Sequence, residues 1–166
     1  MRGHAHVIAR EHITTDEIVP LHHQGADETR LAGHLLEGID AGFAARVRKG
    51  DIVVAGGDFG CGAPREQVVW ALRAARIGAV VARSFARPFY RDALNNGFVV
   101  VECPEAVERA STGDLLEIEL QDSLVKNLTR GETYKFVPYT PFAMEVLEAG
   151  GLLPYVLRQT TGASSA

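Results

Sequence analysis

The sequence lacks several features that define familiar functional classes. It has no block of basic residues and a formal net charge of −4, which excludes the electrostatic footprint of a nucleic-acid-binding protein. No apolar run is long enough to span a bilayer, and the first residues lack the apolar core of a secretory signal. The only two cysteines, Cys61 and Cys103, argue against a disulfide framework. We therefore expect a cytoplasmic protein.

What is present suits one globular domain, because 166 residues with 46% hydrophobic content can bury a sizeable core. We expect this domain to span residues 1–158, followed by a small, polar, disordered tail at 159–166. Residues 51–102 read as strand, helix, strand, helix, strand, which predicts parallel strands with right-handed crossovers. After Cys103, short alternating segments predict antiparallel hairpins and a last helix over 142–151. The predicted fold class is α/β.

The N-terminal part is less regular. A first strand is predicted over 4–9 by its alternating pattern, and a polar turn over 12–20. Leu31, Leu35 and Ile39 recur at helical spacing in a segment closed by glycines, which predicts a helix there.

A glycine-rich loop, GGDFGCGAPRE at 56–66, separates a predicted buried strand from a helix predicted over 64–78. Free backbone N–H groups and the helix dipole favour an anion at such a place. Arg65 can add a forked, charge-assisted contact to a carboxylate or phosphate. The loop therefore predicts either a site for a small anionic molecule or a glycine-rich turn without a ligand.

Other readings of the loop are weaker. A nucleotide-binding loop needs a lysine followed by Ser or Thr, and this chain has Ala63, Pro64 and Arg65 there. Cys61 is either a small residue that fits the turn or a nucleophile, whose base would have to come from the N-terminal segment because no histidine follows His34. Two cysteines do not make a metal site, so none is predicted in this chain.

Four stretches occur in the order and spacing of a known family. They are ITTDEIVP at 13–20, LAGHLLEGIDAGF at 31–43, GDFGCGAPREQ at 57–67 and ARSFARPFYRDALNNGF at 82–98. In these the chain resembles the small subunits of 3-isopropylmalate dehydratase, the swivelling domain of the aconitase superfamily. The resemblance implies a three-layer β/β/α domain.

The same resemblance implies a function shared between two chains. It implies a hydro-lyase of leucine biosynthesis that isomerises a 2-hydroxy polycarboxylate by dehydration and rehydration. The partner would be a large subunit that carries a four-iron–four-sulfur cluster, in a heterodimer or heterotetramer. The present chain has too few cysteines to bind such a cluster itself.

Site residues follow from the matched motifs. By the resemblance, Arg65 binds a substrate carboxylate with help from the backbone around Gly62 and Pro64. Thr15 and Asp16 match a turn beside the active site, although an Asx turn or helix cap explains Asp16 equally well. Ser84 is expected near the site.

The first departure from the family pattern concerns the general base. Family members carry two serines at Ala63 and Pro64, and the first serine takes the proton from the carbon beside a carboxylate. Alanine cannot do so, and loss of a general base costs about 10²–10⁴ in rate. Three explanations remain: another group acts as the general base, the chemistry is altered, or the activity is weak. Glu66 and Cys61 are the nearest candidates for a replacement base.

The second departure follows Pro20, where relatives place a tyrosine–leucine–arginine-like stretch and this chain has LHHQ. His22 and His23 would present ring donors to the substrate instead of a guanidinium. Alternatively, they are solvated loop residues. The sequence thus leaves three hypotheses: a 3-isopropylmalate dehydratase small subunit, a divergent member acting on another hydroxy acid, or a non-catalytic binding subunit.

Overall fold

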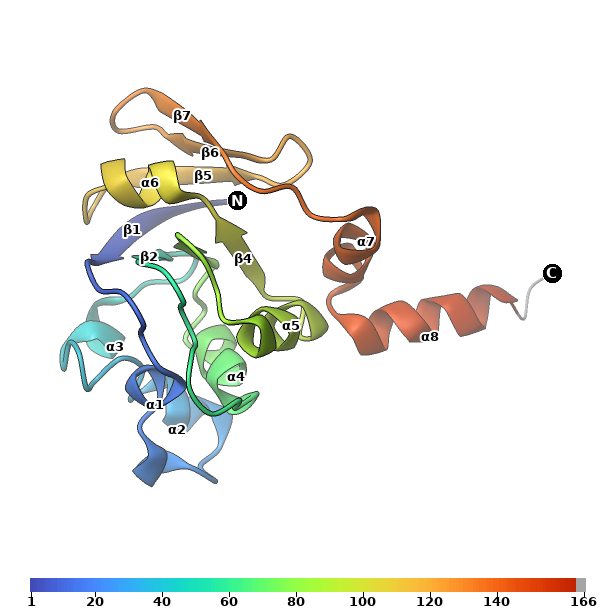
Figure 1. Ribbon diagram of the computed structural model, residues 1–166. Coiled ribbons are helices and arrows are strands. Elements are labelled where there is room, and N and C mark those ends of the chain that lie inside the picture. Colours follow the sequence, from blue (N-terminus) through green and yellow to red (C-terminus); the bar gives the residue numbers. More distant parts are fainter. Residues whose placement is uncertain (164–166) are drawn as a thin grey trace.

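The computed structural model describes residues 1–163, whose strands form one sheet in the order β4-β3-β2-β1-β5-β6-β7 (Figure 1). β1 lies at the centre, parallel to β2 on one side and antiparallel to β5 on the other. The bounds of the strands are β1 Arg2–Ile8, β2 Ile52–Ala55, β3 Ala79–Ala82, β4 Val99–Glu102, β5 Leu115–Glu119, β6 Leu124–Asn127 and β7 Glu132–Lys135. The α/β fold class predicted from the sequence is confirmed.

The parallel half of the sheet is buried on both faces. Every residue of β2 and β3 is buried, as expected where helices cover the two sides of parallel strands. α4 (Gln67–Ala74) and α5 (Arg87–Asn95) connect β2, β3 and β4 and share one hydrophobic core with them, while α6 (Pro104–Arg109) packs into a second core on the opposite face. The predicted alternation of strands and helices is confirmed, although α4 is shorter than the segment predicted for it.

The N-terminal segment contains four short elements: α1 Thr15–Ile18, the 3₁₀ helix η1 Leu21–His23, α2 Glu28–Ala32 and α3 Phe43–Arg46. The continuous helix predicted around Leu31, Leu35 and Ile39 is wrong. α2 ends at Ala32, and Leu36 has a left-handed backbone (φ 58°) that no helix continues through. Leu31 is buried from α2, and Leu35 is buried as well, because the turn that follows also brings its side chain to the core.

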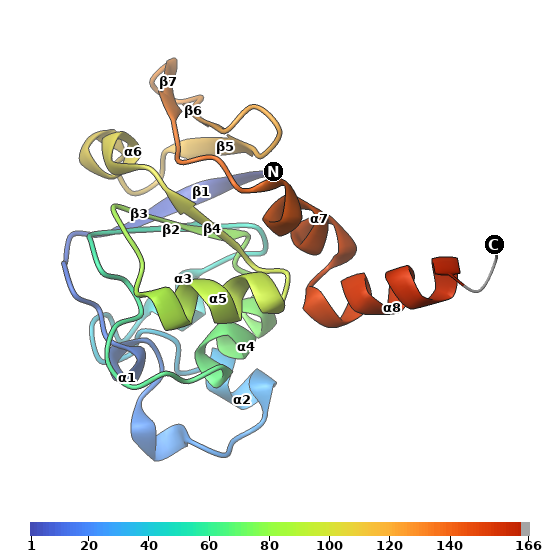
Figure 2. The same ribbon diagram turned by 45° about the vertical axis from the view of Figure 1, so that its right-hand side comes forward.

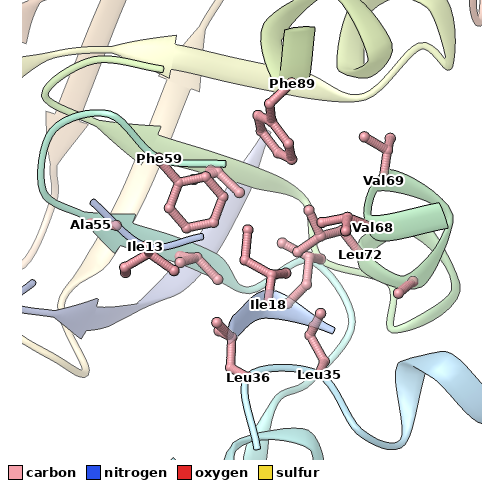
Figure 3. Close-up of a cluster of buried hydrophobic side chains, with 14 of the residues drawn as sticks. Ile13, Ile18, Leu35, Leu36, Ala55, Phe59, Val68, Val69, Leu72 and Phe89 are labelled. Carbon is pink, nitrogen blue, oxygen red and sulfur yellow. The ribbon is translucent and has the colours of Figure 1, made fainter. Parts of the chain in front are cut away.

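The first core fixes the N-terminal segment against α4 and α5 (Figure 3). Ile18 of α1 has no exposed surface and lies in the same cluster as Phe59 of the glycine loop and Leu72 of α4. Full burial of one such side chain stabilises the fold by about 1.5–3 kcal/mol. This hydrophobic cluster therefore fixes the positions of the glycine loop and α1 relative to each other.

The C-terminal helices are α7 (Pro141–Ala149) and α8 (Leu152–Ala163), and α8 projects from the body of the domain in both views (Figure 2). The tail predicted at 159–166 begins inside α8, which continues to Ala163; residues 164–166 lie outside the described residues. Over residues 1–163, no helix has the length and hydropathy needed to cross a membrane.

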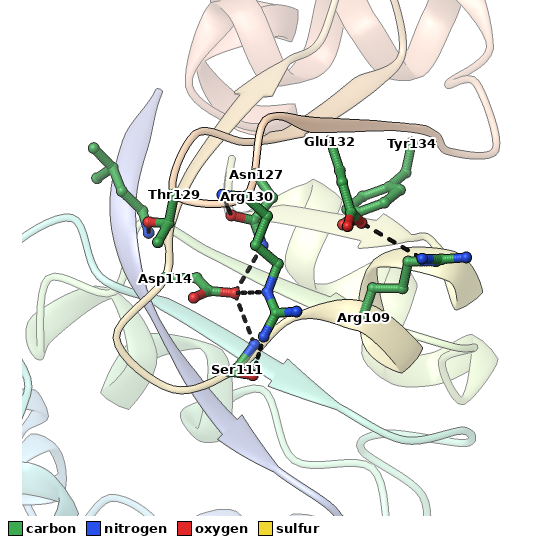
Figure 4. A network of polar contacts seen from close by, with 9 residues as sticks. Arg109, Ser111, Asp114, Asn127, Thr129, Arg130, Glu132 and Tyr134 are labelled. Carbon is green, nitrogen blue, oxygen red and sulfur yellow. Dashed lines mark hydrogen bonds and ion pairs between the residues drawn. The ribbon is translucent and has the colours of Figure 1, made fainter.

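A buried carboxylate organises the antiparallel half (Figure 4). Asp114 Oδ2 accepts hydrogen bonds from Ser111 N (2.9 Å), Asn127 Nδ2 (2.7 Å) and Arg130 Nε (3.0 Å). These donors, first of all the Ser111 backbone N–H, hold the pKa of Asp114 below its usual range. The network joins the turn before β5 to the turn between β6 and β7.

Candidate functional site

The glycine loop runs from the end of β2 to α4 and lies beside α1 (Figure 1). Its backbone pairs with the segment before α1: His12 N donates to Gly57 O (2.9 Å), and Gly60 N donates to Ile13 O (2.8 Å). Thr15 N then donates to Cys61 O (2.9 Å). Two matched motifs that lie far apart in the sequence, at 13–20 and 57–67, are thus brought side by side.

Two glycines make the loop possible. Gly60 has φ +81°, and a Cβ there would lie 2.3 Å from Cγ of Phe89, so a side chain is excluded both by conformation and by space. Gly62 has φ +87° without such a clash and is exposed. The loop therefore packs closely on α5 at Gly60 and turns its backbone outward at Gly62.

Side chains on both flanks brace the loop. Thr15 Oγ1 donates to Ala63 O (2.7 Å), and Ser84 Oγ accepts from Asp58 N (2.8 Å). Thr14 caps α1 in a reciprocal capping box with Glu17, which positions Thr15 and Asp16 in the first turn. The structure thus places Thr15, Asp16 and Ser84 at the loop; their predicted contacts with a substrate stay predictions.

Arg65 occupies an unusual position just before α4. Its side chain is only 7% exposed, and its Nη1 donates to Val19 O (2.6 Å) and contacts Asp16 Oδ1 (3.3 Å). Nε and Nη2 are buried and have no hydrogen-bond partner within residues 1–163. These two nitrogens form the edge of the guanidinium that binds a carboxylate with two parallel hydrogen bonds. One edge of Arg65 is therefore anchored to α1, and the other is unused.

The two candidate bases named from the sequence, Glu66 and Cys61, fit the role poorly. Glu66 Oε1 accepts from Asn96 Nδ2 (3.0 Å), which ties the carboxylate to the C-terminal end of α5. Burial raises the pKa of the Cys61 thiol, and the nearby Asp58 carboxylate raises it further. Cys61 therefore carries less thiolate at neutral pH than an ordinary cysteine, which also weakens its reading as a nucleophile.

Sequence reasoning missed His12, whose Nδ1 lies 3.0 Å from Asp58 Oδ2. With Cys61 the two residues place one potential metal-ligand atom each within 4.8 Å of one another. His12 and Asp58 both have left-handed backbones, with φ 53° and 54°. Since the pair forms only when the glycine loop docks on residues 12–15, no local pattern could reveal it.

His22 and His23 contact a different part of the chain. Nε2 of His23 lies 2.8 Å from Glu37 Oε1, and Nε2 of His22 lies 3.7 Å from the same oxygen. His34 Nδ1 lies 2.6 Å from Glu37 Oε2. The His34 contact, followed by that of His23, holds the pKa of Glu37 below its usual range. Within residues 1–163, the hydrogen bonds and ion pairs of these histidine side chains go to Glu37, and none goes to residues 57–65.

The aconitase C-terminal domain family matches residues 4–106 of the chain. The 3-isopropylmalate dehydratase small subunit of Deinococcus deserti is 50% identical over 155 residues, which cover 93% of this chain and 86% of that protein. The small subunit of Moorella thermoacetica is 46% identical over 160 residues and 96% of each chain. A crystal structure of 3-isopropylmalate dehydratase from Methanocaldococcus jannaschii matches with a TM-score of 0.93 and 36% identity, over 99% of this chain and 97% of that one.

The chain therefore belongs to the aconitase C-terminal domain family, in the branch of the 3-isopropylmalate dehydratase small subunits. The family resemblance carried by the four motifs is confirmed.

Proposed function

We propose that this chain is the small subunit of a hydro-lyase that isomerises a 2-hydroxy polycarboxylate, most simply 3-isopropylmalate, in leucine biosynthesis. The similarity to small subunits over nearly the whole chain supports the reaction class. The unused Nε–Nη2 edge of Arg65 is the observation on this chain that supports a carboxylate ligand. A buried donor without a partner costs about 1–3 kcal/mol, and a bound carboxylate would recover that cost.

In this proposal the carboxylate is bound by Arg65 and by the outward-facing backbone at Gly62. Because Nε and Nη2 are buried, the carboxylate reaches them only when Arg65 or the residues covering it shift. The contact to Asp16 is long, at 3.3 Å, and the Asp16 side chain is 46% exposed, so breaking it costs under about 1 kcal/mol. In the absence of the substrate, the weak contact with Asp16 helps to hold the Arg65 guanidinium in its observed position.

The cysteines of this chain do not fit an iron–sulfur cluster. Cys103 is buried, with its Sγ 3.4 Å from Lys135 O, and Cys61 is half-buried in the glycine loop on a different part of the domain. A four-iron–four-sulfur cluster takes four thiolates as a rule. We therefore assign the cluster to a large subunit, which would cover the exposed Gly62, Ala63 and Pro64.

The missing serine leaves the proton acceptor to be assigned. Glu66 is tied to Asn96, and Cys61 has a raised pKa, so neither fits the role. The fold adds His12 beside the loop, with its Nδ1 on Asp58 and an exposed ring. Exchange of His12 for Gln tests whether it takes the proton. Ala63→Ser should raise the rate about 10²–10⁴-fold if the serine alone was lost.

The proposal is tested by anaerobic reconstitution with the cognate large subunit. We expect stable assembly and turnover of 3-isopropylmalate or of a closely related 2-hydroxy diacid or triacid. Assembly without turnover of any such acid, also after Ala63→Ser, would support a non-catalytic binding subunit instead. Turnover confined to a different hydroxy acid would identify a divergent member of the family.

A further inference from the structure

A cluster of three histidines and one glutamate lies in the segment that follows α1 and is not used by the proposed reaction. η1 contributes His22 and His23, and the turns after α2 contribute His34 and Glu37. A backbone hydrogen bond from Leu36 N to Ile18 O (2.8 Å) fixes the turn that carries Glu37 to α1, and a local bond from His23 N to Pro20 O (3.0 Å) closes η1. The four side chains are therefore gathered by the fold.

The ligand atoms are spaced as a metal ion requires. One ligand atom each of His22, His23 and Glu37 lie within 4.8 Å of one another, and Nε2 of His22 and of His23 lie 3.7 and 2.8 Å from Glu37 Oε1. Tetrahedral zinc with bonds of about 2.0–2.1 Å holds its ligand atoms about 3.4 Å apart. The observed separations bracket that value, so small side-chain shifts suffice.

The surroundings favour this arrangement. His34 Nδ1 holds the second oxygen of Glu37 at 2.6 Å, the type of contact that orients a metal-binding carboxylate. The His34 ring stacks on His23 with centroids 3.5 Å apart, which fixes the His23 ring. The His23 side chain is 13% exposed and that of His22 is 72% exposed, so an ion can enter from solvent.

We propose that His22, His23 and Glu37 bind one divalent transition-metal ion of the zinc type, with His34 as a positioning residue. Two imidazoles and one carboxylate suit zinc, cobalt or nickel, whereas magnesium and calcium prefer oxygen ligands. A hollow of about 270 Å³, whose lining includes His22, His23 and Arg30, has room for a water molecule beside the two histidines. The substrate contact predicted from the sequence for His22 and His23 stays a separate prediction.

The test is calorimetric titration of the chelator-treated full-length chain with ZnCl₂, together with visible spectra after addition of CoCl₂. We expect one ion per chain at this site and the d–d absorption of four- or five-coordinate cobalt. His23→Ala and the near-isosteric Glu37→Gln should each abolish that ion and its spectrum. His34→Ala should weaken zinc binding about 10–100-fold, as loss of an outer partner does.

Two control variants separate this site from other histidines. His4→Ala removes an exposed histidine of β1, and His12→Ala disrupts the His12–Asp58–Cys61 group; both should leave the ion and its spectrum unchanged. Absence of zinc binding would overturn the proposal. Binding that survives both His23→Ala and Glu37→Gln, or that is lost with His12→Ala, would overturn it as well. Circular dichroism of each variant confirms that the fold is retained.

Discussion

Exchange of Asp114 for alanine tests how the antiparallel half of the domain is held together. The change removes the acceptor of three hydrogen bonds. Arg130 is 42% exposed, so its ion pair contributes under about 1 kcal/mol. Asn127 has no exposed surface, and leaving its amide without a partner costs about 1–3 kcal/mol. We expect the free energy of unfolding to fall by about 2–3 kcal/mol.

The assay is urea denaturation at several pH values, with the exposed Asp122→Ala as control. Because the folded-state pKa of Asp114 is lowered, its stabilising contribution is complete above the unfolded pKa of about 3.9 and is lost as pH falls through the folded value. The difference between wild type and Asp114→Ala should therefore stay constant from pH 7 to about 5 and shrink as the pH falls below about 3.9, while Asp122→Ala stays within about 0.5 kcal/mol of wild type. A loss below about 1 kcal/mol, or a difference independent of pH, would refute the reasoning.

Two further predictions concern the glycine loop. In thermal denaturation, Gly60→Ala should lower the free energy of unfolding by about 2 kcal/mol more than the control Gly25→Ala. Both glycines have positive φ, but only a Cβ at Gly60 would clash with Phe89. Equal losses would show that the close packing of Gly60 on Phe89 is unimportant. Because the pKa of the Cys61 thiol is raised, this thiol should react with iodoacetamide more slowly than an ordinary thiol at pH 8. The reaction should become faster as the pH rises, and also in the Asp58→Asn variant, which removes a carboxylate that adds to the effect of burial on the pKa. Rapid reaction at pH 7 would contradict this.

The regular elements of the fold were predictable because they depend on local patterns. The apolar runs that become β2, β3 and β4 are bounded by turn residues, and their order with the intervening helices predicts parallel pairing. The predicted helix fails beyond Ala32 because the burial of Leu35 is produced by a turn, which helical spacing cannot distinguish from a helix. The small, polar residues at 159–163 gave no signal for the end of α8.

The candidate site was predictable only in part. The glycine loop and Arg65 could be identified from composition and from the matched motifs. The anchoring of Arg65 to Val19 could not, since those residues are 46 positions apart in the sequence. The same holds for His12 with Asp58, also 46 positions apart, and for His23 with Glu37, 14 positions apart. Such contacts depend on tertiary docking, which no local pattern encodes.

The most direct test of carboxylate binding at Arg65 is the kinetics of Arg65→Lys in the reconstituted complex. Lysine keeps the positive charge but cannot offer the paired Nε–Nη2 edge. With 3-isopropylmalate, or with whichever hydroxy acid the complex turns over, we predict a KM about 10–100-fold above wild type, the equivalent of losing charged hydrogen bonds worth about 1.5–3 kcal/mol. The control Arg73→Lys, an exposed position on α4, should leave KM unchanged. Unaltered KM and kcat in Arg65→Lys would contradict the account.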